Sequence, residues 1–284
     1  MSLKQVTLGL IQMSLSKNLE ENRNKALQKI RGAHSKGAKI IALPELFTTL
    51  YFPQDEKVDA SHLAEPIPGP TTETLSSLAR ELDIILVAGS IFERDGGQFF
   101  NTAIIIDNKG QLLGKYRKIH VPQDTYFYEK NYFAPGDSGY LVVSTDLGKI
   151  AVLICYDQWF PEAARSVALQ GADIIFYPTA IGTIEGVEEK EGNWCEAWTT
   201  IQRGHAIANS VYVAAINRVG QEKRLHFWGG SFISSPFGEL LAQAGDQEEI
   251  LFTSCDLSQG REIRKDWGFF RNRRPETYQA ITKK

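Results

Sequence analysis

The sequence carries the same order of elements twice, and this internal repeat constrains the fold more than any other feature. Each half begins with a strand of continuous apolar residues, then a helix with one apolar face, then a second apolar strand. Continuous apolar runs are typical of parallel strands that are covered on both faces. Each unit is followed by a further helix, a further strand and a hairpin. The strand–helix–strand units end at Glu45 and Thr179, and the hairpins lie at residues 101–118 and 229–241.

Two such halves bury all of their apolar strands if their sheets pack face to face and the helices cover the outside. The repeat therefore predicts an α/β fold of four layers, α-β-β-α, with an internal pseudo-two-fold relation. Because the two sheets would share one core, residues 1–284 are expected to form a single domain. A hydrophobic content of 43% supplies the apolar side chains that such a core needs.

The charge balance argues against two classes of partner. The chain has 31 Lys and Arg residues against 34 Asp and Glu, a net charge of −3, which does not favour nucleic acid or anionic lipid. Three widely spaced cysteines suit a reducing compartment rather than a disulfide framework. Gly9 and Gln12 interrupt the apolar run at residues 6–13, so neither a signal peptide nor a membrane span is expected there. These features predict a cytoplasmic protein.

One cysteine lies at the end of a predicted buried strand. The apolar residues 150–154 lead into Cys155, and Pro161 then opens an alanine-rich segment that Gly171 closes, as in a helix. Cys155 is therefore expected at the C-terminal end of a strand, where α/β sheets place their reactive groups. Backbone N–H groups at such a turn can lower a thiol pKa and bind an oxyanion. The alternative is a small buried hydrophobic residue, the common environment of an isolated cysteine.

A carboxylate and a lysine occupy comparable positions. Because Pro44 cannot continue a central strand, Glu45 is presented at the end of the strand at residues 40–43. Alternation along the hairpin at residues 101–118 places Lys118 on the same face as Tyr116. Taken singly, the acid is better explained by a helix cap or a salt bridge, and the lysine by an exposed surface.

The three residues occur in the chain order Glu45, Lys118, Cys155. This order resembles the Glu–Lys–Cys triad of the nitrilase, or carbon–nitrogen hydrolase, superfamily, and the resemblance covers nearly the whole chain. The α-β-β-α sandwich of that superfamily agrees with the repeat described above. The motifs that carry the resemblance are Pro44-Glu45, residues 116–120 and residues 155–165.

The resemblance implies a role for each residue. Glu45 would take the proton of Cys155, whose sulfur attacks an amide or carbamoyl carbon. Lys118 and the backbone N–H of Tyr156 would hold the oxyanion, and water activated by Glu45 would cleave the resulting thioester. Glu129 matches a second glutamate of the family that orients the substrate and Lys118. No metal or cofactor is required by this chemistry.

Within the superfamily, residues 155–165 and 176–182 most resemble the N-carbamoylputrescine amidases. The resemblance implies hydrolysis of N-carbamoylputrescine to putrescine, carbon dioxide and ammonia. Relatives that act on N-carbamoyl-D-amino acids carry two arginines shortly after the catalytic cysteine, which bind the substrate carboxylate. This chain has Gln158 and Trp159 there, and neither can neutralise a carboxylate.

An acidic loop follows the strand at residues 173–178. Glu185, Glu188 and Glu189 in this loop suit a substrate that ends in an ammonium group beyond an apolar chain. The alternative is a solvated loop, the usual fate of such a charge run. The residues expected to bind the substrate are Glu129, Tyr156, Trp159, Thr179, Ala180 and Glu185.

The triad alone does not choose among the members of the superfamily. Another amidase, such as a β-ureidopropionase or an aliphatic amidase, carries the same three residues. A different class is a catalytically inactive binding subunit of the same fold, against which the intact triad argues. Measurement of released ammonia separates an enzyme from such a subunit.

The C-terminal run at residues 261–274 mixes charges with Trp267, Phe269 and Phe270. A tail of this composition more often packs on a neighbouring subunit or on the domain flank than binds nucleic acid. We expect the tail from about residue 258 to lie at a subunit interface of a homo-oligomer. The remaining expected partner is a small carbamoyl-amine substrate.

Overall fold

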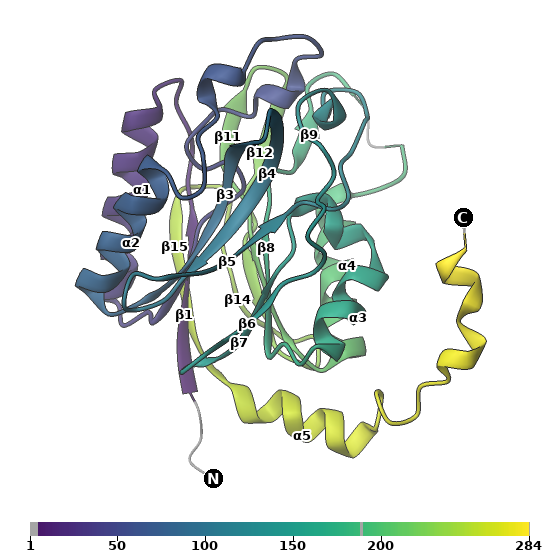
Figure 1. Cartoon of the computed structure of the whole chain (residues 1–284). Helices are drawn as coiled ribbons and strands as arrows, with labels where there is room; N and C mark the ends of the chain where they lie inside the picture. The colour runs from purple at the N-terminus through teal and green to yellow at the C-terminus, as the bar shows by residue number, and fades with distance from the viewer. Residues whose placement is uncertain (1–4, 188–189, 284) are drawn as a thin grey trace.

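The computed structural model describes residues 5–187 and 190–283, and within them two six-stranded sheets lie between layers of helices (Figure 1). In spatial order, the first sheet contains β15 (Glu249–Asp256), β1 (Gln5–Gln12), β2 (Ile40–Ala42), β3 (Ile85–Asp95), β4 (Gln98–Ile106) and β5 (Leu112–Arg117). The second contains β6 (Val142–Thr145), β7 (Gly148–Val152), β8 (Ile174–Pro178), β10 (Tyr212–Ile216), β13 (Phe232–Ser234) and β14 (Leu240–Gln243).

Helices cover the outer faces of both sheets. In Figure 1, α1 (Leu19–Ser35) and α2 (Pro70–Leu82) lie on one side, and α3 (Pro161–Leu169) and α4 (Trp194–Asn209) on the other. The start of α1 follows from its sequence, because the Asn18 side chain accepts hydrogen bonds from the backbone N–H groups of Glu20 and Glu21. The four-layer α-β-β-α arrangement predicted from the repeat is confirmed.

The pairing of the strands repeats in the two sheets. β1, β2 and β3 are parallel neighbours, as are β7, β8 and β10. β3 then pairs antiparallel with β4 and β10 with β13, and one antiparallel strand, β15 or β6, flanks each unit on its other side. The correspondence holds strand by strand across each sheet, so the predicted pseudo-two-fold relation is present.

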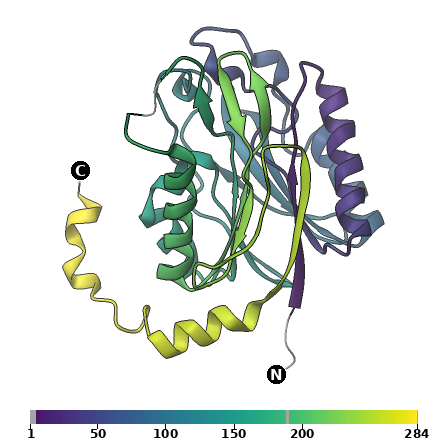
Figure 2. The same ribbon diagram turned by 180° about the vertical axis from the view of Figure 1, so that it is seen from behind.

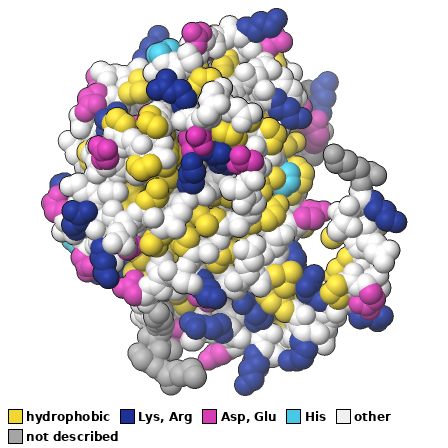
Figure 3. Space-filling model, viewed as in Figure 1, with side chains coloured by type: hydrophobic (Ala, Val, Ile, Leu, Met, Phe, Trp, Pro, Cys, Tyr) yellow, Lys and Arg dark blue, Asp and Glu magenta, His cyan; other side chains and the backbone are white. Residues whose placement is uncertain are grey.

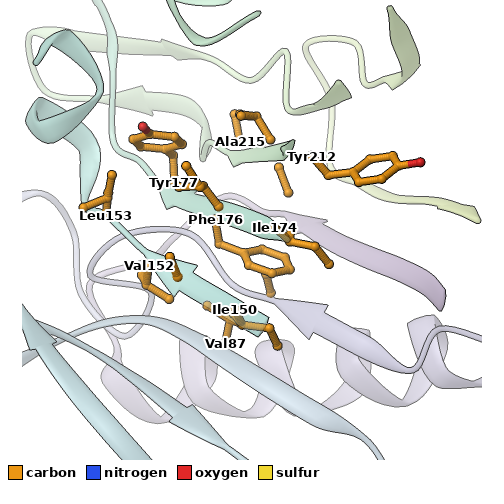
Figure 4. Close-up of a cluster of buried hydrophobic side chains, with 14 of the residues drawn as sticks. Val87, Ile150, Val152, Leu153, Ile174, Phe176, Tyr177, Tyr212 and Ala215 are labelled. Carbon is orange, nitrogen blue, oxygen red and sulfur yellow. The ribbon is translucent and has the colours of Figure 1, made fainter. Parts of the chain in front are cut away.

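The core lies between the two sheets. Figure 4 shows Val87 from β3 facing side chains of the second sheet, among them Ile150 and Phe176. A separate apolar cluster between the first sheet and its helices includes Ile30 and Leu75, neither of which is exposed to solvent. Burial on both faces explains why the parallel strands are continuously apolar in the sequence.

Two features were not predicted. A small sheet of β9 (Gly182–Ile184), β11 (Val219–Glu222) and β12 (Leu225–Trp228) forms at the end of the sandwich, from strands of three or four residues that show no clear alternation. Beyond β15, the chain forms α5 (Leu257–Trp267) and then a segment with two short 3-10 turns, which leaves the body of the protein (Figure 2). In the described part of the chain, no helix has the length and apolar character to cross a membrane.

Candidate active site

Three strand ends bring the predicted triad together. Glu45 follows β2, Lys118 is the residue after β5, and Cys155 follows β7. β5 runs in the same direction as β2, because it is antiparallel to β4 and β4 is antiparallel to β3. The ends of β2 and β5 therefore lie at one edge of the first sheet, and the second sheet presents Cys155 to them.

Lys118 lies between two carboxylates. Its Nζ donates hydrogen bonds to Oε1 of Glu45 at 2.9 Å and to the two carboxylate oxygens of Glu129 at 2.9 and 2.7 Å. The side chains of all three residues are 0% exposed. The surface-lysine alternative is thus wrong, and Glu45 does form a salt bridge, with Lys118. A lysine buried to this extent requires such partners, because an unpaired charge in a protein interior is strongly unfavourable.

Cys155 occupies a strained turn. Its φ of 44° lies in the left-handed region, which residues with a Cβ atom rarely adopt. The carboxylate of Asp157, which is fully buried, holds this turn by accepting hydrogen bonds from the backbone N–H of Ile154 at 2.8 Å and from the hydroxyl of Tyr116 at 2.7 Å. The Sγ atom lies 3.9 Å from the carbonyl oxygen of Ala180. Strain that neighbouring contacts maintain is typical of functional positions.

The turn that carries Glu45 is also held in an unusual conformation. Leu46 has a φ of 47°, and its backbone N–H donates a hydrogen bond to Oγ of Ser90 at 2.9 Å. β3 passes so close to this turn that a Cβ atom on Gly89 would lie 1.8 Å from the carbonyl oxygen of Pro44. Only glycine permits that approach, so the position of the turn depends on it.

The two carboxylate oxygens of Glu45 differ in their contacts. Oε1 accepts hydrogen bonds from Lys118 and from Nδ2 of Asn101, at 2.9 and 2.7 Å. Oε2 is buried and has no hydrogen-bond partner among the residues that the structure describes. A buried carboxylate oxygen without a donor can accept a hydrogen bond from a thiol or a water molecule beside it.

The electrostatics of the site keep the thiol protonated. Burial raises the pKa of Cys155 well above its usual value; the charge of Glu45 raises it further and that of Lys118 partly opposes the rise. Burial alone would lower the pKa of Lys118, but Glu129 and Glu45 raise it overall, so the lysine stays charged. Burial raises the pKa of Glu129 to about 7, against the opposing effect of Lys118. Reaction at Cys155 therefore needs a base at the moment of attack.

A cavity of about 260 Å³ opens onto Cys155. Its wall is mostly apolar, with Glu129 at the buried end and the exposed Asp124 at the mouth. The residues that line it are Pro122, Asp124, Phe127, Glu129, Cys155, Tyr156, Gln158, Trp159, Ala180, Ile181, Gly182, Trp194 and Ala197. The cavity suits an apolar chain with a polar group at each end.

Four of the residues predicted to bind the substrate line this cavity, namely Glu129, Tyr156, Trp159 and Ala180. Thr179 instead lies behind the wall, where its hydroxyl is 3.3 Å from Oε1 of Gln158. Glu185 is exposed and is not among the lining residues. Glu188 and Glu189 lie outside the described residues.

Sequence reasoning missed several contributors to the site. Three of them form side-chain hydrogen bonds to residues far away in the chain, and no local sequence pattern indicates such bonds: Asn101, Tyr51 and Asp157. Asp124 had a weaker signal, because it lies in an irregular segment rich in aromatic residues. In the ranges 5–187 and 190–283, no group of three His, Cys, Asp or Glu side chains has the arrangement of a metal site.

Comparison with known proteins adds to this geometry. A family model described as carbon-nitrogen hydrolase matches residues 7–265. An N-carbamoylputrescine amidase from Solanum lycopersicum is 42% identical, over 97% of this chain and 94% of its own length. A citrullinase from Francisella tularensis is 39% identical, over 98% of this chain and 99% of its own. The crystal structure of a carbon-nitrogen hydrolase from Helicobacter pylori G27 matches with a TM-score of 0.94 and 37% identity, over 99% of both chains.

Proposed function

Because the chain belongs to the carbon–nitrogen hydrolase family, we propose that Glu45, Lys118 and Cys155 are the catalytic residues of this amide-cleaving hydrolase. The observation that carries the proposal is Oε2 of Glu45, which accepts no hydrogen bond from any described residue, in a buried site that also holds a charged lysine and a protonated thiol. A base, a fixed cation and a nucleophile are the groups that acyl transfer from an amide requires.

The reaction proceeds in two halves. Glu45 accepts the thiol proton as the sulfur of Cys155 attacks the carbonyl carbon, and Lys118 with the backbone N–H of Tyr156 stabilises the oxyanion. The C–N bond then breaks, the amine leaves with the proton from Glu45, and a thioester remains. In the second half, water gives a proton to Glu45 while its oxygen attacks the thioester. The C–S bond breaks as that proton returns to sulfur, which releases a carbamic acid and restores the enzyme. The carbamic acid then loses carbon dioxide to give the second amine.

The proposed substrate is N-carbamoylputrescine, which water converts to putrescine, carbon dioxide and ammonia. The side chains of Phe127, Trp159 and Trp194 provide an apolar wall for the four methylene groups. The carboxylate of Asp124 at the mouth suits the terminal ammonium. The identity of 42% to a relative named for this activity supports the same substrate.

Replacement of Asp124 by asparagine is expected to raise KM for N-carbamoylputrescine about tenfold and to change kcat much less. The ammonium contact is made equally in the ground state and the transition state, so its loss affects mainly binding. Initial rates of ammonia release over a range of substrate concentrations measure both constants. N-butylurea, which has the same chain without the ammonium, serves as control and should show no change in KM.

Glu185→Gln provides the matched variant, because the sequence predicted Glu185 as the acid that binds the substrate ammonium. A rise in KM for Glu185→Gln together with an unchanged KM for Asp124→Asn would transfer the ammonium contact to Glu185. Equal effects on N-carbamoylputrescine and N-butylurea would show that Asp124 does not recognise the ammonium.

A second candidate substrate is citrulline, since a relative at 39% identity is a citrullinase. At the end remote from the carbamoyl group, citrulline carries a carboxylate beside its ammonium, whereas N-carbamoylputrescine carries the ammonium alone. The residues that line the cavity include two carboxylates, Asp124 and Glu129, and none of these lining residues is a lysine, an arginine or a histidine. These lining residues therefore favour N-carbamoylputrescine, whose remote end has no carboxylate. A higher kcat/KM for citrulline, or for N-carbamoyl-β-alanine, than for N-carbamoylputrescine would refute the proposed substrate.

We also propose that the protein works as a homo-oligomer through its C-terminal segment. Figure 3 shows this segment standing apart from the body. Between it and the surface of α3 and α4 lies a groove of about 710 Å³, whose lining includes Leu169, Phe269 and Ile281. The side chains of Trp267 and Ile281 are 58% and 64% exposed, which is unfavourable for a lone chain in water. We further propose a cytoplasmic location, which the reduced thiols of Cys155 and Cys255 support.

Light scattering at micromolar concentration is expected to give a mass at least twice that of one chain. Truncation after residue 256 should reduce the assembly to a smaller species, because it removes α5 and the segment beyond it. A monomeric mass for the full chain, or an unchanged mass for the truncated one, would contradict this role of the tail.

A further inference from the structure

A buried ion pair lies directly behind the turn that carries Glu45. It joins Arg218, which follows β10, to Glu222 at the end of β11, with 2.8 Å between Nη1 and Oε1. The two side chains are 0% and 2% exposed, and neither residue is among those that line the cavity. Both come from the second half of the chain, whereas Glu45 comes from the first.

Arg218 binds the backbone of the turn rather than its side chains. Its Nη2 donates hydrogen bonds to the carbonyl oxygens of Glu45 and Leu46 at 2.6 and 3.1 Å, and Nη1 donates one to Thr49 at 3.3 Å. Leu46 is the residue with a φ of 47°. Such a conformation persists only when surrounding contacts impose it. The guanidinium provides these contacts because its planar donors reach several acceptors at once.

Glu222 fixes the other end of the same turn. Its Oε2 accepts a hydrogen bond from the backbone N–H of Tyr51 at 2.6 Å, and the hydroxyl of Tyr51 donates one to Oε1 of Glu129, also at 2.6 Å. Glu129 in turn binds Lys118. The ion pair therefore fixes the backbone of Glu45 through Arg218. It fixes the backbone of Tyr51, whose hydroxyl orients Glu129, through Glu222.

We propose that Arg218 and Glu222 are positioning residues that hold Glu45 and Glu129 in the geometry required for proton transfer from Cys155 and for charge stabilisation by Lys118. This inference rests on the catalytic roles proposed above. The ion pair itself contacts neither the substrate nor the reacting atoms. A displacement of about 1 Å at a reacting group can reduce the rate of the chemical step by about 10²-fold, so a small shift of the turn is sufficient.

The test compares the conservative variant Arg218→Lys with the double variant Arg218→Met/Glu222→Leu. The double variant removes both charges, which avoids leaving one buried and unpaired. We expect kcat for N-carbamoylputrescine to fall about 10²-fold in the double variant and less in Arg218→Lys, with KM within about threefold of the wild-type value. The control is Leu75→Ala on α2, which lowers stability through a core cavity and removes none of the hydrogen bonds that hold the turn.

Circular dichroism and thermal melting are measured on all variants. A folded double variant with wild-type kcat would overturn the proposal. If the double variant does not fold, the test rests on Arg218→Lys. A kcat loss of at least tenfold, at a Tm no lower than that of Leu75→Ala, supports the positioning role. A kcat equal to that of Leu75→Ala overturns it. Failure of the catalytic roles themselves would appear separately, as turnover in Cys155→Ala.

Discussion

Replacement of Cys155 by alanine is expected to lower kcat by about 10³-fold or more while the protein keeps its fold. Without the thiol no thioester can form, and members of a catalytic unit that acts together lose almost all of their joint effect when one is removed. Among the described residues, the polar contact of the buried thiol is a long one, 3.9 Å to the carbonyl oxygen of Ala180, so its loss leaves no ion pair or strong hydrogen bond unsatisfied there. Ammonia release and thermal melting measure the two quantities.

The chain offers a matched control for this substitution. Cys255 on β15 is also buried, and burial raises the pKa of its thiol to about 12, but it lies in the core between the sheets. Cys255→Ala should leave kcat within about threefold of the wild-type value and should lower Tm through the cavity it creates. Substantial turnover in Cys155→Ala, or equal losses of activity in both variants, would exclude Cys155 as the nucleophile.

The sequence was sufficient for the parts of the fold that rest on local pattern. Continuous apolar strands mark the two sheets, and alternation along β5 correctly placed Tyr116 and Lys118 together. The small sheet at the end of the sandwich was missed because strands of three or four residues carry too little periodicity. α5 was missed because its mostly exposed face and its aromatic residues suggested an irregular tail.

For the site, the sequence supplied the reactive groups but not the residues that hold them. The residues that hold the reactive groups come from distant parts of the sequence: Arg218, Glu222 and Asp157. Each of them forms its hydrogen bonds to the first half of the chain only after the two halves have packed together. Nothing in the local sequence distinguishes a buried arginine from an exposed one. The selection of Glu185 shows the same limit, because whether a loop acid lies at a cavity depends on where the loop is placed.

Replacement of Lys118 by methionine is expected to abolish turnover, by about 10³-fold or more, and to make stability depend strongly on pH. Loss of the cation removes the oxyanion contact and leaves Glu45 and Glu129 buried together without a positive charge to pair with. Breaking a buried ion pair in this way destabilises a protein by about 3–5 kcal/mol. Burial raises the pKa of Glu129 to about 7 even with Lys118 opposing it, so without the lysine that pKa rises further.

The direction of the pH effect follows from proton linkage. Glu129 has a higher pKa in the folded state than in the unfolded state, so its protonated form favours folding: this contribution is fully present below the unfolded pKa, about 4.3, and is lost as pH rises through the folded value. Tm of Lys118→Met should therefore fall more steeply than wild-type Tm between pH 5 and pH 8.

Lys115→Met is the control, because Lys115 lies on the opposite face of β5 and binds Glu93. It should retain kcat within about threefold and show the wild-type pH dependence of Tm. Parallel Tm curves for Lys118→Met and the wild type would mean that the two carboxylates do not depend on Lys118 for their charge.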